Sequence, residues 1–346
     1  MARRLFAFLA LLGLALVCSS SAAFAQYTET ILVADSTNTA TTANLPDPFL
    51  INAWGLTKGP GLPFWVADNG SGWSTLYTGS GVKVPLNVIV PAAVPGATGS
   101  PTGIVFNGTG QFKVQGWSAF FIFATLDGTI SGWAPQVDLH HAILQVNKSK
   151  LKASYTALAI TNNTNGPNFL FAADTANNKV DIFDDHFEPM GFFTDRSVPQ
   201  GFTVFGIRDI GGLLYVSFAD SAGGPGGVID IFTERGRFVK HLTSGSPLNQ
   251  PWGFAAAPAN FGPLSNTLLV SNNVNNTGTI NAFDALTGAF VGTVSDANGA
   301  PIQIDQLWAI DFGGGDGDNG ATNELFFTAG PANNTQGIFG SISLNP

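Results

Sequence analysis

A short apolar pattern recurs six times along the chain, and this repetition limits the possible folds more than any other feature. In the clearest copies, a tryptophan followed by glycine or alanine precedes two further apolar runs; these copies contain Trp54, Trp252 and Trp308. Weaker copies fill the gaps, so that a small anchor residue recurs about every 50 residues. The six anchors are Gly55, Gly103, Ala157, Gly206, Gly253 and Ala309.

Each repeat has the composition of a group of β-strands. Its three apolar runs are rich in β-branched and aromatic residues and are bounded by Gly, Asn and Asp. A fourth run lies in the spacers, for example at Leu86–Val90 and Phe290–Val294. Only Leu5–Val17 could form a helix. Four strands repeated radially predict an all-β fold, a six-bladed β-propeller of four-stranded antiparallel blades.

The two ends of the repeat array indicate how the ring closes. The sixth repeat ends at Leu344 without room for its own outer strand, whereas Thr30–Ala34 reads as a strand that belongs to no repeat. We therefore expect this N-terminal strand to pair with the last blade and close the ring. Residues 26–346 are then predicted to be a single β-propeller domain.

Residues 1–25 have the pattern of a secretory signal peptide. Arg3 and Arg4 precede the apolar run Leu5–Val17, and Ala23–Ala25 is a small-x-small cleavage site. We predict cleavage near Ala25 and a secreted or periplasmic protein. The only cysteine, Cys18, would be discarded with this segment, which leaves no disulfide or thiolate site. Lipid attachment at Cys18 is disfavoured because the bulky Val17 precedes it.

Charge composition argues against several classes of partner. Only 11% of the residues are charged, against roughly 25% in a typical soluble domain, and the net charge is −9. No Lys/Arg cluster follows the first four residues, so we expect no nucleic-acid partner. No later stretch is apolar for long enough to span a membrane. We expect a monomer that binds a small ligand, a glycan or an extracellular protein.

Long motifs in the chain resemble those of known propellers. Phe169–Asp184 resembles an NHL-type repeat, in which an apolar strand and Ala-Asp precede a short turn and Lys/Arg-Val-x-Val-Phe. The whole chain is similar to a family of uncharacterised secreted bacterial proteins. The shared segments are Asn52–Leu56, Phe64–Gly70, Pro101–Asn107, Phe121–Trp133 and Pro247–Phe254. This resemblance implies a six-bladed propeller exported from a bacterium, and it implies no particular activity.

Strand direction predicts where ligand-binding residues would gather. The inner strands start on the face where the second strands end, so side chains from both should meet at one mouth of the channel. The candidates are Trp54, Asp68, Asn69, Asp127, Asp174, Asp220, Trp252, Asn272, Asn273 and Trp308. They could hold a sugar-like or peptide-like ligand, or a Ca²⁺ ion with its roughly 6–8 oxygen ligands. Alternatively, the polar residues satisfy turn backbones and the tryptophans pack between blades.

Familiar catalytic motifs are missing from the sequence. His140, His141, His186 and His241 lack the spacing of a metal site apart from the adjacent pair, and no Gly-x-Ser-x-Gly elbow occurs. Asp316–Gly320 departs from the EF-hand pattern and is interpreted as a polar hairpin loop. The leading hypothesis is a non-catalytic ligand- or protein-binding module without a cofactor. The alternative is a Ca²⁺-dependent hydrolase or lyase of the lactonase kind, with its site at the channel mouth and its catalytic residues unknown.

Overall fold

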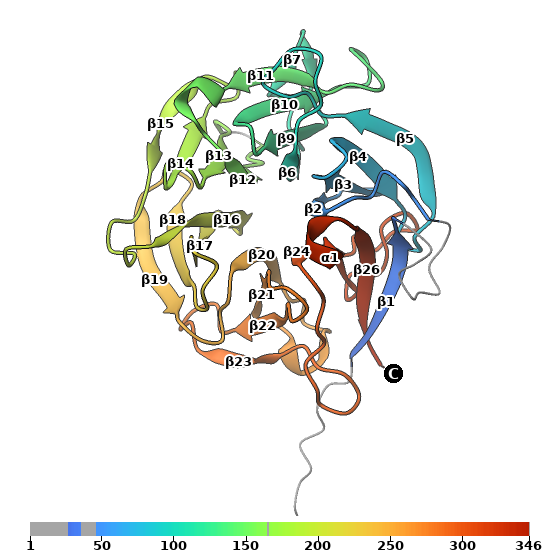
Figure 1. Ribbon diagram of the computed structural model, residues 1–346, viewed down its shortest axis with the longest axis vertical. Coiled ribbons are helices and arrows are strands. Elements are labelled where there is room, and N and C mark those ends of the chain that lie inside the picture. The colour runs from blue at the N-terminus through green and yellow to red at the C-terminus, as the bar shows by residue number, and fades with distance from the viewer. Residues whose placement is uncertain (1–26, 36–45, 165, 346) are drawn as a thin grey trace, which may run out of the picture.

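The computed structural model describes residues 27–35, 46–164 and 166–345. Its strands form six four-stranded antiparallel sheets arranged as blades around a central channel (Figure 1). The predicted six-bladed propeller is therefore confirmed. The predicted signal peptide and Cys18 lie outside the described residues. Within the described part, no helix is long and apolar enough to cross a membrane.

Every blade runs from an inner strand at the channel to an outer strand at the rim. The first contains β2 (Ala53–Thr57), β3 (Phe64–Asp68), β4 (Trp73–Tyr77) and β5 (Lys83–Ile89). The second contains β6 (Pro101–Phe106), β9 (Phe121–Thr125), β10 (Thr129–Trp133) and β11 (Ile143–Asn147). The third contains β12 (Tyr155–Ile160), β13 (Leu170–Asp174), β14 (Lys179–Phe183) and β15 (Pro189–Phe193).

The remaining three blades follow the same order. The fourth contains β16 (Phe202–Ile210), β17 (Leu213–Asp220), β18 (Val228–Thr233) and β19 (Phe238–Ser244). The fifth contains β20 (Pro251–Ala256), β21 (Leu268–Asn272), β22 (Ile280–Phe283) and β23 (Phe290–Thr293). The sixth contains β24 (Leu307–Phe312), β25 (Leu325–Ala329), β26 (Ile338–Leu344) and β1 (Tyr27–Ala34).

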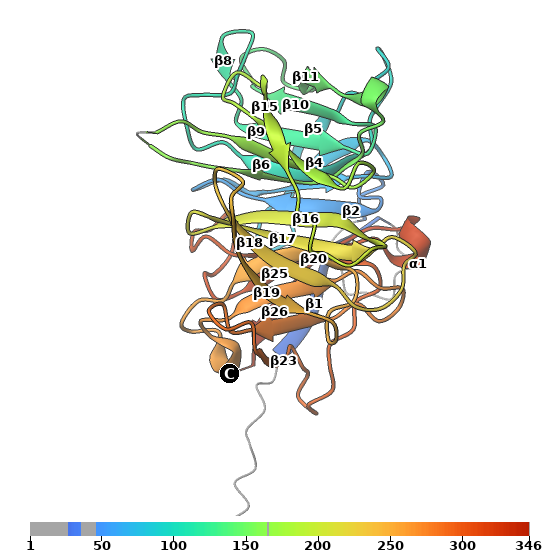
Figure 2. The ribbon, with the colours of Figure 1, turned by 90° about the vertical axis from the view of Figure 1, so that its left-hand side faces the viewer.

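Short elements decorate the loops between these strands. A hairpin of β7 (Lys113–Val114) and β8 (Trp117–Ser118) lies between β6 and β9. Two 3₁₀ turns span Ser149–Leu151 and Gly262–Leu264. The one-turn helix α1 (Pro331–Asn334) follows β25 and projects from one face of the ring (Figure 2).

The N-terminal strand closes the ring, as predicted. β1 pairs antiparallel with β26, from Tyr27 opposite Leu344 to Ala34 opposite Ile338. The strand is three residues longer at its start than the Thr30–Ala34 segment expected from the sequence, and the buried Tyr27 hydroxyl donates to the Phe261 carbonyl at 2.6 Å. The outer strand of the last blade thus comes from the opposite end of the described chain (Figure 1).

The anchor residues of the repeat lie where inner strands of neighbouring blades nearly touch. A Cβ atom on Gly103 would stand 2.3 Å from the Leu158 nitrogen, and one on Gly206 would stand 2.0 Å from the Trp252 carbonyl oxygen. Each of the six inner strands also has a register shift at this level. Small residues recur in the sequence because a larger side chain would separate the blades here.

Buried hydroxyl groups connect the blades at the same level. At five of the six junctions, a buried Ser or Thr donates to a carbonyl oxygen on the inner strand of the next blade. The bonds are Thr102 to Tyr155 (2.7 Å), Thr156 to Phe205 (2.7 Å), Ser217 to Pro251 (2.7 Å), Ser271 to Trp308 (2.5 Å) and Thr328 to Trp54 (2.5 Å). At the junction of the first two blades, the Asn69 amide donates to the Pro101 carbonyl at 3.1 Å instead.

Further out, aromatic rings fill the wedges between blades. Ring centroids lie 4.4 Å apart for Phe64 and Phe326, and 4.1 Å apart for the stacked rings of Trp65 and Phe121. Both faces of most sheets are therefore buried, and large apolar residues must cover both. Among the described residues, this packing accounts for the many buried phenylalanines and for the low content of charged residues.

We predict that the anchor glycines are essential for stability. In Gly206→Ala, the new methyl group would overlap the Trp252 carbonyl, and the free energy of unfolding should fall by about 3 kcal/mol. Gly110→Ala is the matched control, because a Cβ there has no heavy atom within 4 Å. Chemical denaturation measures both changes; equal effects from the two variants would contradict this account.

We also predict that the bridging hydroxyls contribute measurably. Ser271 Oγ accepts the Gly253 N–H at 2.8 Å while donating to Trp308, so Ser271→Ala leaves two buried backbone groups without this partner. The expected loss is about 2 kcal/mol of unfolding free energy. Ser149→Ala removes only an exposed bond to Asn147 and should have almost no effect on the same denaturation curve.

Candidate functional site

Three tryptophans fill the central channel near the starts of the inner strands. The rings of Trp54 and Trp308 are stacked with centroids 3.7 Å apart, and the Trp252 ring stands edge-on to both, at 6.3 and 5.7 Å. The side chains come from β2, β24 and β20, and no more than 7% of any of these residues is exposed. The three rings therefore pack against one another across the channel.

The indole nitrogens of this tryptophan plug are all bonded within the protein. Trp54 and Trp308 both donate to Asn52 Oδ1, at 2.9 and 3.2 Å. Trp252 donates to the Thr156 carbonyl at 3.1 Å. The packing function of these tryptophans is thus evident in the structure, and a role in contacting ligand stays a prediction.

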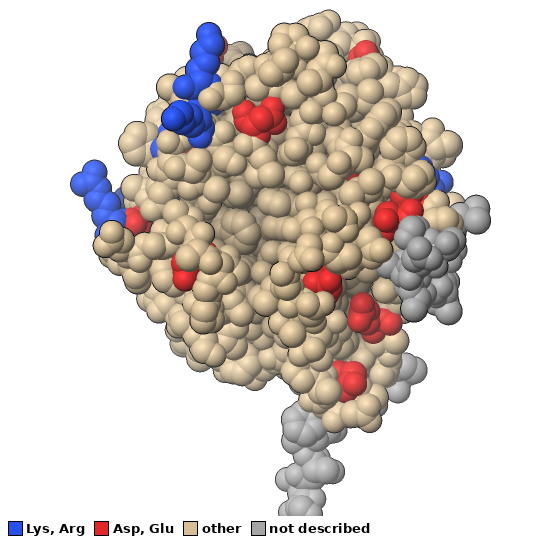
Figure 3. Space-filling view, viewed as in Figure 1, with Lys and Arg blue, Asp and Glu red and all other residues tan. Residues whose placement is uncertain are grey.

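The face of the ring that carries α1 has a shallow central hollow. Figure 3 shows that Lys, Arg, Asp and Glu side chains lie around this hollow rather than in it. The inner strands start on this face, because α1 directly follows the end of β25 (Figures 1 and 2). This is the face on which the sequence places the candidate residues.

Four of the candidate polar residues occupy equivalent positions in their blades. Each pairs with the first residue of its inner strand: Ala53 with Asp68, Tyr155 with Asp174, Phe202 with Asp220, and Pro251 with Asn272. The sequence alignment of the repeats is therefore correct at this level.

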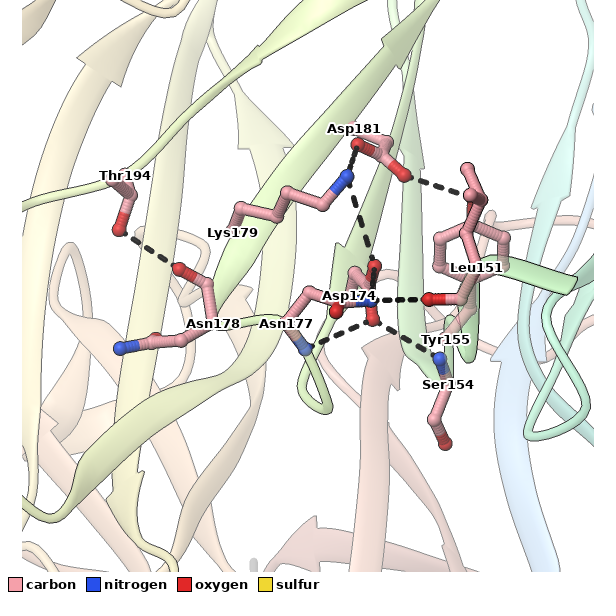
Figure 4. A network of polar contacts seen from close by, with 9 residues as sticks. All are labelled: Leu151, Ser154, Tyr155, Asp174, Asn177, Asn178, Lys179, Asp181 and Thr194. Carbon is pink, nitrogen blue, oxygen red and sulfur yellow. Dashed lines mark hydrogen bonds and ion pairs between the residues drawn. The ribbon is translucent and has the colours of Figure 1, made fainter. Parts of the chain in front are cut away.

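Asp174 shows how such a residue is held (Figure 4). Its Oδ1 accepts the Ser154 N–H at 3.0 Å, and its Oδ2 accepts the Asn177 amide at 2.7 Å and lies 3.8 Å from Lys179 Nζ. Lys179 also pairs with Asp181 at 2.5 Å, and Asp181 accepts the Tyr155 hydroxyl. Burial, with the Asp181 carboxylate beside it, raises the pKa of Tyr155 above its usual range. The Asp174 carboxylate is thus surrounded by protein donors.

The other polar candidates also contact the protein itself. Asn69 and Asn273 donate to carbonyls on the next blade, those of Pro101 and Leu307, both at 3.1 Å. Asp220 accepts the N–H of Ala222 within its own turn, whereas Asp127 and Asn272 accept the N–H groups of Ala93 and Asn249, which are distant in the sequence. Only the Asp220 contact is of the turn-stabilising kind, and the others join separate segments of the ring. Their use as ligand-binding residues is not tested by these contacts and stays a prediction.

Asp68 is completely buried, as Asp174 is, but neither of its carboxylate oxygens has a hydrogen-bond partner among the described residues. Burial raises the pKa of its carboxyl group well above the usual range, and the nearby Asp47 carboxylate raises it further. Asp47 itself pairs with Lys83 Nζ at 2.6 Å and accepts the Tyr77 hydroxyl at 2.6 Å. Burial and the neighbouring carboxylate thus both oppose ionisation of Asp68.

A cavity of about 290 Å³ occupies the channel on the other side of the tryptophan plug, and all six inner strands line it. Three charged side chains meet there. Lys58 follows β2, Arg208 lies in β16, and Asp311 lies near the end of β24. Asp311 Oδ2 is 3.2 Å from Lys58 Nζ, and its Oδ1 is 2.8 Å from Arg208 Nη2.

The electrostatics of this channel triad (Lys58, Arg208 and Asp311) favour ionised groups. Burial alone would raise the pKa of Asp311, but the charges of Arg208 and Lys58 outweigh it and hold the pKa below its usual value. The sequence-based candidates did not include these residues. The available signal was position: each follows an anchor residue by two or three positions.

The segment around Asp316 is a polar hairpin loop, as the sequence indicated. It connects β24 to β25, and Asp316 accepts the N–H groups of Asp318 and Gly61 at 3.0 and 3.1 Å. Among the described residues, no group of three or more His, Cys, Asp or Glu side chains is arranged to hold a metal ion.

Comparison with known proteins identifies relatives in a giant virus. The chain is 32% identical to the uncharacterized protein R648 of Acanthamoeba polyphaga mimivirus over 337 residues, which cover 90% of this chain and 78% of R648. It is 30% identical to protein L690 of the same virus, with 86% and 81% covered. No family model matches the chain. The bacterial origin and the NHL-type repeat stay predictions.

Solved structures with the same fold include two lyases. The virginiamycin B lyase of Staphylococcus aureus is 14% identical, with a TM-score of 0.54 and 92% of this chain and 99% of that chain covered. A streptogramin B lyase is 13% identical, with a TM-score of 0.53 and coverage of 92% and 97%. At this level of identity the likeness shows the fold alone.

We predict that a metal chelator leaves the melting temperature of the protein unchanged. The carboxylate of Asp174 bonds to protein donors, so it does not need a cation to balance it. Differential scanning fluorimetry with and without EDTA measures the effect, with a calcium-dependent protein as the positive control. A lower melting temperature that added Ca²⁺ restores, together with stoichiometric calcium in the purified protein, would refute this prediction.

Proposed function

The chain belongs to the family that includes R648 and L690 of Acanthamoeba polyphaga mimivirus, and we propose that it is a non-catalytic binding module whose small ligand occupies the channel cavity. The observation that carries the proposal is the cavity lined by all six inner strands, in which the channel triad gathers. Sites of this kind combine an apolar wall with a few convergent polar groups.

The size of the cavity favours a small molecule over a polypeptide. Its volume of about 290 Å³ is at the lower end of the range for ligand pockets, roughly 300–1,000 Å³. Aliphatic side chains such as Leu56, Ile104 and Ile310 line part of the wall, and polar groups contribute the larger part of its surface. A compact ligand would bury most of its surface there, whereas a peptide chain would not fit.

The charged groups of the channel triad are suited to binding rather than to proton transfer. A general acid or base works best when its pKa lies near the working pH. Asp311 has a pKa below its usual value because Arg208 and Lys58 stabilise its charged form. It therefore stays ionised at neutral pH and fixes the two cations in place. This arrangement supports a module that holds its ligand without changing it.

The proposal also includes export. The pattern of Arg3 and Arg4, the apolar run Leu5–Val17 and the cleavage site at Ala23–Ala25 supports secretion. The ligand would then be met outside the cytoplasm.

A ligand screen tests the binding function. Thermal shift and tryptophan fluorescence on the mature protein, with succinate, inorganic phosphate, glucose and glycine as probes, report occupation of the cavity, whose wall includes Trp252. We expect at least one probe to raise the melting temperature by about 2–4 °C. Thr57→Trp, which fills the cavity from a partly exposed position, should abolish that shift.

Thr277→Trp is the control for this screen, since Thr277 is exposed and does not line the cavity. It should leave the shift intact. A shift that Thr57→Trp does not affect would place binding elsewhere. Turnover of an ester or lactone that Thr57→Trp abolishes would overturn the non-catalytic assignment.

A further inference from the structure

The channel triad contains more positive than negative charge. Lys58 and Arg208 share one carboxylate, that of Asp311, whose two oxygens both take part in these ion pairs. Asp311 is buried, with only 12% of its side chain exposed, compared with 16% for Lys58 and 35% for Arg208. The negative charge is therefore enclosed, and the two cations are its more accessible neighbours.

The triad still has N–H groups that can donate hydrogen bonds to a ligand. A guanidinium carries more N–H groups than any other side chain. Within the described residues, Arg208 has two acceptors, the Ile310 carbonyl at 3.1 Å and Asp311 Oδ1 at 2.8 Å. Lys58 Nζ has Asp311 and the face of the Phe64 ring, whose centroid is 5.5 Å away. Both cations can therefore donate further bonds to a ligand.

The other polar groups of the wall offer little competition. Asn162 Oδ1 already accepts the Gly108 N–H at 2.8 Å. Asp209 Oδ1 accepts the Gly212 N–H at 3.1 Å. Burial, together with the neighbouring Glu234, raises the pKa of Asp209 to about 6, so Asp209 loses its negative charge as the pH falls below that value. The rest of the wall consists of the Thr57 hydroxyl, aliphatic and aromatic side chains, and backbone.

Building on the proposed binding function, we propose that the ligand is a small organic anion whose carboxylate or phosphate-type oxygens bind Lys58 and Arg208 in the channel cavity. Lys58 and Arg208 have N–H groups that are not used within the triad, and these would form charge-assisted hydrogen bonds to an anion. The apolar body of the ligand would pack on Leu56, Ile104 and Ile207. A neutral sugar fits less well, because it needs acceptors as well as donors. A cation would be repelled by two like charges.

Isothermal titration calorimetry on the mature protein, with succinate and inorganic phosphate as anionic probes and glucose as the neutral probe, tests this assignment. We expect at least one anion to bind more tightly than glucose, with an affinity that falls as sodium chloride is added. Arg208→Met should weaken that binding by about tenfold or more, because it removes a charged donor. The two anions distinguish carboxylate from phosphate recognition.

Asp311→Asn has the opposite expected effect. It keeps the shape of the side chain but removes the internal anion that competes for Lys58 and Arg208, so the anion should bind about tenfold more tightly. Lys113→Met is the matched control for charge: Lys113 is exposed on the β7–β8 hairpin, and its loss should leave the affinity unchanged. Melting curves confirm that each variant is folded; if Arg208→Met is not, Asp311→Asn decides.

The outcomes separate the ligand class from the binding function. Glucose or glycine binding that Thr57→Trp abolishes, without anion binding, overturns the anion assignment and leaves the proposed function intact. Anion binding that neither Arg208→Met nor Asp311→Asn alters also overturns the assignment, because it places the anion outside the triad. If no probe binds at all, both the assignment and the proposed function fail.

Discussion

The near contact between inner strands of neighbouring blades is the constraint on which the rest of the structure depends. At Gly206 the backbones are so close that even a methyl group would overlap the Trp252 carbonyl. Buried hydroxyl groups, such as those of Ser271 and Thr328, then form hydrogen bonds directly from one blade to the next. These contacts fix the radius of the ring and hence the width of the channel.

A channel of fixed width explains how the two ends of the inner strands come to differ. Near the strand starts, Trp54, Trp252 and Trp308 pack across the channel and satisfy their own N–H groups. Near the strand ends, the space is left open and Arg208 and Asp311, from blades that are not neighbours, meet across it. The plug forms the floor of the cavity, so a ligand can enter from one side and pack against a rigid wall.

The periodic features of this fold are readable from the sequence, whereas the pairings made by ring closure are not. Six anchors at a regular interval and one strand without a repeat predict six blades and the pairing of β1 with β26. The same pattern places Asp174 and Asn272 at equivalent positions. However, Lys58, Arg208 and Asp311 belong to three different blades, and only the closed ring brings them together. The equivalent positions in the second, third and fifth repeats hold apolar residues, so no shared motif marks the triad.

Anomalous scattering from a crystal soaked in selenate would test most directly whether the channel is an anion-binding site. Selenate is a tetrahedral oxyanion that resembles the phosphate-type head group proposed for the ligand, and its selenium atom can be located without ambiguity. The account predicts a selenium peak in the cavity, with oxygens within hydrogen-bonding distance of Lys58 Nζ and the Arg208 guanidinium. Peaks confined to the outer surface of the ring, with none in the cavity, would contradict it.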